Sequence, residues 1–375
     1  MVLYFNQLRA LCISDITSHQ QHNLYTPRGA QVRDALAWSE QILESIDRFG
    51  DRLEVQFASH HWPTWGRAAV VSYLELQRDL YKFIHDQSLR LANLGFNMDE
   101  IAEQLELPEE LAREFSCRGY YGTLNHGAKA VYVKYLGHFD GNPANLHPHP
   151  PVAAAKRYLE FMGGADAIVT KARTNFEEGD YRWVAQVLNQ GVIAEPQHAG
   201  ARALLADTFE QLGYQSESAV WRNFYLCGAL ELRHGTPASS PNWIPPATAD
   251  NMPLEDVFKA MAVRLNPQRS QGLTLRFALR FSDLDQSWSL IIQRSILHAC
   301  RSDQMDGQIG GQVTTIDCHS QDFKRVLLGL APAPDLIQRG ELRITGDSSA
   351  LATLGGLFDS FERRFPIVTP RTMPG

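Results

Sequence analysis

Short apolar runs and amphipathic helical patterns alternate along the first third of the chain. Apolar runs at Val2–Phe5 and Leu8–Ile13, and the alternating run Leu53–Phe57, are typical of β-strands. Between them, Ala35–Phe49 has apolar residues at helical spacing and stops at Gly50, a residue that commonly ends helices. This order predicts α/β or layered αββα architecture that starts with β structure almost at the first residue.

The next patterns are helical. From Ala69 to about Asn93 an apolar stripe predicts one long helix that ends before Gly95. Two short helices with a turn between them, Asn97–Leu105 and Leu107–Ala112, resemble a helix-turn-helix. Asp and Glu cover the faces that a DNA-binding protein would make basic, so we expect these helices to pack within the fold and not to bind DNA.

A longer helical stretch runs from about Ala154 to Arg233. Within it, Gly179-Asp180-Tyr181 recurs loosely as Gly213-Tyr214-Gln215, and the period of 34 residues is that of tetratricopeptide repeats. Two helix pairs are too few for a solenoid and leave apolar faces open. They are expected to pack on a neighbouring domain or on a second copy of the chain, and we favour dimerisation.

The last third follows a linker rich in Pro and Ser, His234–Pro246. Strict alternation from Leu273 to Phe281, a turn at Asp283–Gln286 and a second run from Trp288 to Ile292 predict a β-hairpin. Further strands are expected at Ile309–Thr315 and Leu342–Ile344, and helices at Leu254–Leu265, Phe323–Leu330 and Ala350–Phe361. The pattern predicts a separate α+β domain with one apolar face, suited to covering an apolar pocket.

Composition narrows the class of protein. With 375 residues the chain is too long for one average core, so two or three domains are expected. The net charge of −7 argues against a general nucleic-acid binder, and no apolar run is long enough to cross a bilayer. The five cysteines are scattered without a C-x-x-C pair, which predicts neither a disulfide framework nor a thiolate zinc site. No signal peptide is visible, and the compartment stays open.

A histidine pair is the main candidate for site chemistry. Ser59-His60-His61-Trp62-Pro63 follows the predicted strand Leu53–Phe57, which places two imidazoles at the rim of a sheet, where metal sites are often built. Candidate partners lie upstream, at Asp15 and in the segment Thr17–Asn23. From the residues alone two interpretations stay open, a metal site and a hydrogen-bonded structural pair. His147-Pro148-His149 has the spacing of a metal motif, but the prolines indicate an extended linker.

The stretch from Arg118 to Pro151 is rich in Gly, Tyr, His and Pro. Glycines let a backbone approach a ligand closely, so this stretch is a candidate ligand-contacting loop.

Several of these segments together resemble one known family. The motifs are Leu11 to Asp15, His22 to Ala30, Val32 to Leu36, Phe57 to Pro63, Leu80 to Gln87, Leu89 to Asn93, Arg118 to Gly122, Phe139 to Ala144 and Trp221 to Leu226. With them, the chain resembles the alkylsulfatases, a branch of the metallo-β-lactamase superfamily. The resemblance implies hydrolysis of alkyl sulfate esters such as dodecyl sulfate, to alcohol and sulfate, at a centre of two zinc ions.

The resemblance also implies roles at the metal centre. Asp15 stands where the family has a metal-bridging glutamate, and its shorter side chain would weaken the bridge. His60 matches a late histidine ligand of the metal. His22 matches the histidine that protonates the leaving oxygen, a role that suits an imidazole titrating near neutrality.

Three further residues match positions that hold the substrate. Arg28 and Arg90 stand where the family grips the sulfate group, and a planar guanidinium suits an anionic cluster of oxygens. Tyr121, in the Gly-rich loop, matches a group that hydrogen-bonds a sulfate oxygen.

The resemblance implies a multidomain chain that combines α/β and α+β folds. Residues 1–117 would be the C-terminal part of a metallo-β-lactamase αββα catalytic domain, 118–235 an all-α TPR-like dimerisation domain, 236–248 a linker and 249–375 a sterol-carrier-like domain, which Gly340–Asp347 matches.

The Thr-His-x-His-x-Asp-His motif of the first zinc ligands does not occur. We therefore expect that the chain lacks an N-terminal part of the family's catalytic domain, and that zinc is incompletely bound. A homodimer is the expected assembly, and the alternative function is that of a non-catalytic, lipid-binding or scaffold protein.

Overall fold

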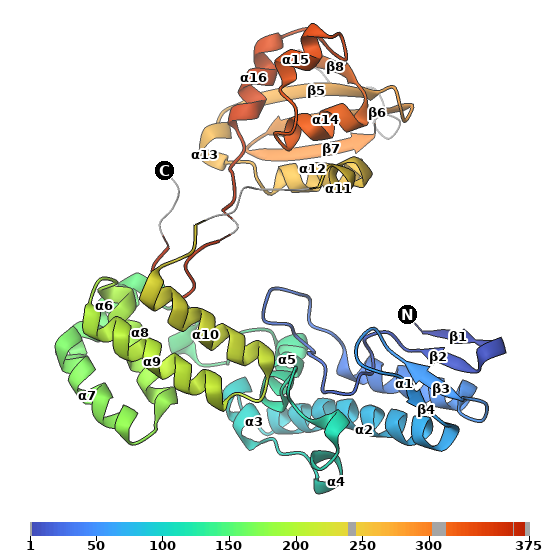
Figure 1. Cartoon of the computed structure of the whole chain (residues 1–375). Helices are drawn as coiled ribbons and strands as arrows, with labels where there is room; N and C mark the ends of the chain where they lie inside the picture. Colours follow the sequence, from blue (N-terminus) through green and yellow to red (C-terminus); the bar gives the residue numbers. More distant parts are fainter. Residues whose placement is uncertain (1, 239–244, 302–312, 363, 372–375) are drawn as a thin grey trace. The chain divides into compact units, whose positions relative to one another are not determined.

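The computed structural model describes residues 2–238, 245–301, 313–362 and 364–371 (Figure 1). The chain forms two compact units. The first consists of Met1–Pro237 together with Pro366–Gly375, and the second of Ala238–Phe365.

A small sheet opens the first unit. Its members are β1 (Leu3–Phe5), η1 (Asn6–Leu8, a 3-10 turn), β2 (Ala10–Cys12), β3 (Val55–Phe57) and β4 (Thr64–Trp65), in the strand order β1-β2-β3-β4. The two central strands are parallel, with Ala10 opposite Val55, and the outer pairs are antiparallel. Helix α1 (Ala35–Phe49) makes the crossover that a parallel pair requires. The predicted αβ alternation is confirmed here.

Helices α1 and α2 (Arg67–Asn93) pack together beside this sheet (Figure 1). Asp34 caps the start of α1 by accepting a hydrogen bond from the backbone N of Ala37 at 3.1 Å. The predicted apolar stripe of α2 is buried, namely Val70, Leu74, Leu80, Tyr81 and Ile84. The elements that follow are α3 (Met98–Gln104), α4 (Glu109–Ala112), η2 (Phe115–Cys117), α5 (Leu124–Leu136) and η3 (Pro143–Asn145).

The helical stretch predicted from sequence is a layered array of helices with its own core. Its members are α6 (Pro151–Met162), α7 (Ala165–Glu177), α8 (Tyr181–Ala194), α9 (Ala199–Gln215) and α10 (Ala219–His234). Two successive helix pairs are present, but α8 starts at Tyr181 and α10 at Ala219, 38 residues later. The difference from the predicted 34 arises because α9 has 17 residues and α7 has 13. The extra turn puts Gly213 inside α9.

The second unit is an α+β fold. Its helices are α11 (Pro246–Asn251), α12 (Leu254–Ala262), α13 (Pro267–Ser270), α14 (Ser320–Leu327), α15 (Ala333–Gln338) and α16 (Ser348–Gly356). Its strands are β5 (Thr274–Phe281), β6 (Gln286–Gln293), β7 (Ile296–Arg301), β8 (Thr314–Cys318) and β9 (Leu342–Thr345), in the order β7-β6-β5-β8-β9. The predicted hairpin is β5–β6, with Phe277 opposite Leu290. Of the strand predicted at Ile309–Thr315, residues 309–312 lie outside the described residues.

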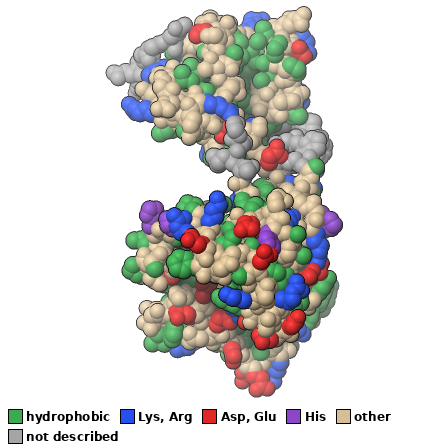
Figure 2. Space-filling model, turned by 90° about the vertical axis from the view of Figure 1, so that its left-hand side faces the viewer, with side chains coloured by type: hydrophobic (Ala, Val, Ile, Leu, Met, Phe, Trp, Pro, Cys, Tyr) green, Lys and Arg blue, Asp and Glu red, His purple; other side chains and the backbone are tan. Residues whose placement is uncertain are grey.

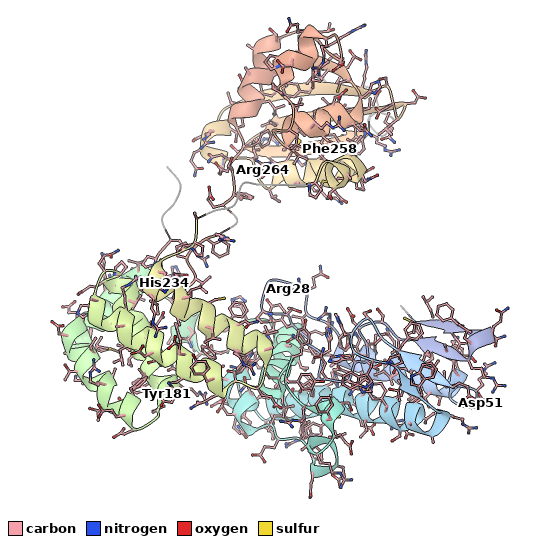
Figure 3. All side chains as sticks on the ribbon, in the orientation of Figure 1. Arg28, Asp51, Tyr181, His234, Phe258 and Arg264 are labelled. Carbon is pink, nitrogen blue, oxygen red and sulfur yellow. The ribbon has the colours of Figure 1, made fainter. Side chains whose placement is uncertain are left out.

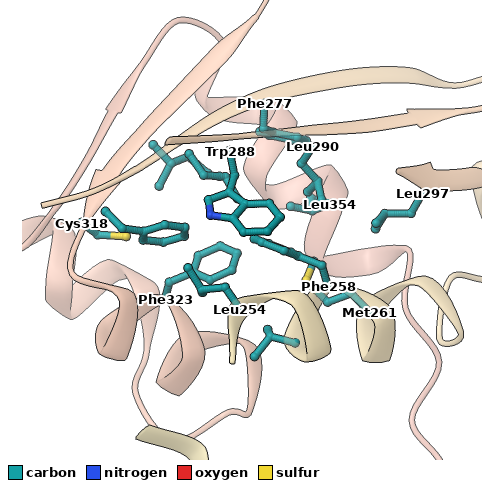
Figure 4. Close-up of a cluster of buried hydrophobic side chains, with 14 of the residues drawn as sticks. Leu254, Phe258, Met261, Phe277, Trp288, Leu290, Leu297, Cys318, Phe323 and Leu354 are labelled. Atoms are coloured by element: carbon teal, nitrogen blue, oxygen red, sulfur yellow. The ribbon is translucent and has the colours of Figure 1, made fainter. Parts of the chain in front are cut away.

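One face of the five-stranded sheet carries the core of the second unit. Phe277, Leu279 and Phe281 on β5 are buried together with Trp288 and Leu290 on β6. Figure 4 shows Phe258 and Met261 of α12, Phe323 of α14 and Leu354 of α16 packed against that face. The mixed α/β and α+β fold class predicted from sequence is confirmed, including the single apolar face.

The surface mixes both signs of charge. On the face shown in Figure 2, Lys and Arg side chains lie next to Asp and Glu. Among the described residues, no helix is both long enough and apolar enough to cross a bilayer.

Candidate metal and substrate site

Asp15 and His60 occupy equivalent places on two neighbouring strands. Asp15 lies three residues beyond the end of β2, and His60 lies three residues beyond the end of β3. Because β2 and β3 are parallel, both chains leave the sheet at the same edge. The backbone N of Ser59 donates to the carbonyl oxygen of Ser14 at 3.3 Å, which keeps the two segments together past the strands. His60 Nε2 thus lies 3.4 Å from Asp15 Oδ1.

His22 completes a group of three with these residues. One ligand atom each from Asp15, His22 and His60 lies within 4.8 Å of the others. His22 is buried, and its backbone N donates to the hydroxyl of Tyr81 on α2 at 3.1 Å. Its Nδ1 lies 3.3 Å from the carbonyl oxygen of Asn23. Since a carbonyl oxygen only accepts, Nδ1 carries the proton, and Nε2 keeps its lone pair for another partner.

Burial sets the protonation of His22. Desolvation, followed by the nearby positive charge of Arg33, lowers the pKa of His22 to about 4. In the chain by itself, burial thus moves the pKa of His22 below the near-neutral range. At neutral pH the imidazole is uncharged, which is the form that coordinates metals and accepts protons.

The three side chains fit a zinc ion by chemistry and by number. Two imidazoles and a carboxylate are ligands that zinc takes in proteins, and catalytic zinc sites commonly use about three protein ligands. Asp15 Oδ1 is buried and accepts no hydrogen bond in the described structure. A carboxylate oxygen left in that state is costly, and a bound cation would offset the cost.

The Gly-rich loop at Arg118–Gly122 is hydrogen-bonded to the segment that carries His22. The backbone N of Gln21 donates to the carbonyl oxygen of Arg118 at 3.0 Å, and the backbone N of Gly122 donates to that of Gln21 at 2.8 Å. A Cβ at Gly122 would lie 2.8 Å from the carbonyl oxygens of Gln21 and His22. Glycine is thus required for the loop to lie this close to His22.

Tyr121 links the group of three to an apolar pocket. Its ring centroid lies 5.1 Å from that of His22, and its carbonyl oxygen accepts a hydrogen bond at 2.7 Å from Ser218 Oγ, at the start of α10. The pocket has a volume of about 400 Å³ and is lined by Thr26, Arg28, Tyr121, Val220, Asn223, Phe224, Cys227 and Ile367. Figure 3 labels Arg28 on the loop between β2 and α1. One aromatic side chain therefore contacts both the candidate metal ligands and a mainly apolar hollow that also holds a guanidinium group.

Comparison with known proteins identifies the family. Residues 97–235 match the family model for alkyl sulfatase dimerisation, and residues 242–370 match that for the alkyl sulfatase C-terminal region. The chain is 43% identical over 371 residues to a linear primary-alkylsulfatase of Pseudomonas sp., which covers 99% of this chain and 54% of that protein. The chain belongs to the alkylsulfatase family.

Other alkylsulfatases show the same extent of similarity. An alkyl/aryl-sulfatase of Saccharomyces cerevisiae is 42% identical over 99% of this chain and 56% of its own length. The solved structure of the stereoselective inverting sec-alkylsulfatase Pisa1 from Pseudomonas sp. has a TM-score of 0.92 at 39% identity, covering 99% of this chain and 58% of that one. The chain thus spans about half the length of the alkylsulfatases it matches.

Arg90, predicted to bind the sulfate group, and His61, the second histidine of the candidate pair, lie away from the group of three. Arg90 is exposed in the last turn of α2, and its Nε donates to Gln87 Oε1 at 2.6 Å. It is nine residues beyond Tyr81, about 13 Å further along the helix at 1.5 Å per residue. His61 is exposed, has a φ of 67°, and its ring meets that of His19 edge-on at 6.5 Å. The structure brings Asp15, His22, His60 and Tyr121 together, places Arg28 at the adjoining pocket, and leaves Arg90 outside.

The sequence did not single out the residues that support the candidate site from a distance. Tyr81 belonged to the predicted apolar stripe of α2, and its hydroxyl, the part that meets His22, carries no signal in such a pattern. Phe224 was inside a family motif, but nothing placed it at a pocket. Ile367 lies in the pocket wall although 246 positions separate it from Tyr121 in the chain. Such contacts follow only from the folded chain.

Replacing Tyr81 with phenylalanine tests how His22 is held. The backbone N–H of His22 would lose its acceptor in a buried position, which costs about 1–3 kcal/mol. We expect the free energy of unfolding to fall by that amount and the zinc affinity to fall by about 10-fold. Urea unfolding and zinc titration measure the two effects. Tyr132→Phe is the matched control, because that hydroxyl donates to the carbonyl oxygen of Phe139, just after α5, at 3.5 Å and not to the backbone of His22. Equal effects of the two substitutions on zinc affinity would contradict the role of Tyr81.

Proposed function

We propose that the protein hydrolyses alkyl sulfate esters to an alcohol and sulfate, as the names of its relatives indicate for them. One observation carries the proposal. Tyr121 lies against His22 of the candidate metal group, and it also lines an apolar pocket that contains Arg28. An alkyl sulfate has an anionic head and an apolar tail, so it needs this combination of a cationic group, a reactive centre and an apolar hollow.

Arg28 and Tyr121 bind the sulfate head in this proposal. A guanidinium group offers several N–H donors in a planar fork, which matches sulfate oxygens, and the phenol adds a further donor. The alkyl tail lies along α10, where Val220, Phe224 and Cys227 line the pocket. The head is thereby held next to His22 and the tail is kept out of water.

The group of three supports reaction at the ester. Asp15 and His60 would hold a zinc ion, with His22 beside them, and such an ion would supply Lewis-acid chemistry when bound. The described residues contain one such group, so the proposal concerns one ion. His22 handles the proton that the leaving oxygen takes up. Burial lowers the pKa of His22 in the chain by itself, and the negative charge of a sulfate beside it acts in the opposite direction.

Further parts of the family assignment belong to the same proposal. The crossover from β2 through α1 to β3, with candidate ligands at the strand ends, supports a metallo-β-lactamase type of catalytic domain in the first unit. The single apolar face of the second unit supports a sterol-carrier-like fold. Pairing of two copies is supported by the match to the dimerisation model and by α6, where Tyr158 and Phe161 are 53% and 92% exposed.

Replacing Arg28 with glutamine tests the substrate class. Octanesulfonate is the binding probe, because its C–S bond is not an ester, and octyl sulfate is the substrate. A lost hydrogen bond to a charged group costs about 1.5–3 kcal/mol, so we expect Arg28→Gln to weaken octanesulfonate binding by about 10- to 100-fold. Calorimetry measures the binding, and ion chromatography measures the sulfate released by the zinc-loaded protein.

Arg90→Gln is the matched control, because Arg90 is an exposed arginine outside the pocket. It should bind octanesulfonate as the unchanged protein does. Octanesulfonate binding without any sulfate release would favour the non-catalytic lipid-binding function. No octanesulfonate binding at all would contradict the proposal.

A further inference from the structure

Glu231 is a buried carboxylate whose partners come from a distant part of the chain. Its side chain lies on α10, and the residue is only 6% exposed. Its Oε2 accepts from the backbone N of Ile367 at 2.7 Å. Its Oε1 accepts from the backbone N of Val368 at 3.2 Å, from that of Thr369 at 3.0 Å and from Thr369 Oγ1 at 2.8 Å. Both oxygens of one carboxylate are thus occupied by three consecutive residues, which we call the C-terminal clasp (367–369).

The clasp also fits the surface of the helical core. Val368 packs against the cluster formed by α6 to α10. A Cβ at Gly228 of α10 would lie 3.6 Å from Val368 Cγ1 and 3.1 Å from the ring of Phe209. The small residue at position 228 therefore makes room for the ring of Phe209, and Val368 lies at ordinary contact distance beside it.

The clasp supplies a wall of the apolar pocket. Ile367 lines the same hollow as Arg28, Tyr121 and Phe224. Glu231 accepts a hydrogen bond from the backbone N of Ile367. The position of the Ile367 side chain in the pocket wall therefore depends on a carboxylate that does not itself line the pocket.

We propose that Glu231 is a positioning residue that holds the clasp so that Ile367 closes the apolar pocket, and that this wall sets how well long alkyl chains are bound. The inference rests on the proposed function, because it takes an alkyl sulfate as the ligand of the pocket. A buried charge needs hydrogen-bond partners, and three backbone N–H groups and one hydroxyl of the clasp supply them. Glutamine at position 231 keeps the size but loses the charge and turns one acceptor into an N–H donor facing the clasp.

Two measurements on the full chain test the inference. Hydrogen exchange of the amides of residues 367–369 reports whether Glu231 holds the clasp. Affinities for methane-, butane-, hexane-, octane- and decanesulfonate report what the wall does. In the unchanged protein each added methylene within the pocket should raise the affinity by about fourfold.

Glu231→Gln should speed exchange of the clasp amides at least about tenfold and lower the gain per methylene to about twofold or less for the longer chains. Ile367→Ala should lower the same gain while leaving the exchange slow. Methanesulfonate affinity should stay unchanged in both variants, because Arg28 and Tyr121 are intact. Glu210→Gln is the control, since Glu210 is paired with Arg233 and does not contact the clasp.

Each outcome decides a separate point. If Glu231→Gln frees the clasp but leaves the chain-length series unchanged, the clasp is structural only and the inference is wrong. Unchanged exchange in Glu231→Gln would also overturn it. If Glu231→Gln does not fold, Ile367→Ala and Thr369→Val give the same test, the latter removing one of the four bonds. If the unchanged protein binds none of the sulfonates, the proposed function fails, whereas the exchange data still report the anchoring.

Discussion

The zinc affinity of the chain is expected to fall by at least about 100-fold when His60 is replaced with alanine. In the proposal Asp15 and His60 hold the ion, and His60→Ala leaves Asp15 as the one proposed ligand, with His22 beside it. One protein ligand is fewer than zinc commonly takes in a catalytic site, and loss of a direct ligand exceeds the 10- to 100-fold effect of losing a residue that only supports one. The side chain of His60 is 51% exposed, so its removal leaves the core intact.

Competition with a chromophoric chelator measures this affinity. His61→Asn is the matched control, since His61 adjoins His60 in the same segment, and asparagine tolerates its φ of 67°. His22→Asn should weaken zinc binding less than His60→Ala does, because His22 is proposed to handle the proton. An unchanged affinity in His60→Ala, or an equal loss in His61→Asn, would contradict the metal site.

Replacing Leu290 with alanine should destabilise the second unit by about 3 kcal/mol, within the usual 2–5 kcal/mol for such a truncation in a core. Leu290 is fully buried at the centre of β6, between β5 and β7 (Figure 4). The shorter side chain loses its contacts with the apolar face and leaves a cavity that the sheet cannot close, because both neighbouring strands are hydrogen-bonded to β6.

Hydrogen exchange measures this effect in peptides from β5, β6 and β8, separately from the first unit. Ile296→Ala is the control, since Ile296 is 53% exposed on β7 of the same sheet and should change stability by less than about 0.5 kcal/mol. Similar exchange in the two variants would show that the apolar face is not the core of this unit.

Local pattern was enough to predict the elements that are regular and have one buried face. Helix α1 begins and ends where the apolar spacing predicts, because Asp34 caps one end and the pattern stops at Gly50. The alternation of apolar and polar residues in β5 and β6 also predicted that these strands pair, because each strand has one buried face. Strand β7 was missed because Leu297 is its one buried residue, so its pattern does not alternate. The sequence pattern did not predict the extra turn of α9, because the two repeats share only loosely similar residues.

The candidate site was predictable where it depends on strand ends. Asp15 and His60 each follow an apolar run, and parallel pairing of two such runs is enough to bring them together. The low pKa of His22 depends on burial and on Arg33, neither of which a sequence pattern reports. The approach of Gly122 to the backbone of Gln21 depends on the packing of segments that are 101 residues apart.

The clasp has a consequence for the order in which the protein can be completed during synthesis. Domains generally fold as the chain emerges, with N-terminal parts first. The first unit includes Pro366–Gly375, so the α+β unit is inserted in its sequence. Glu231 is made long before its partners at Ile367–Thr369. Until those residues leave the ribosome, the Glu231 carboxylate has none of these four hydrogen bonds and the pocket lacks the Ile367 wall. Of the two units, the one whose sequence starts first is therefore also the one whose sequence is completed last.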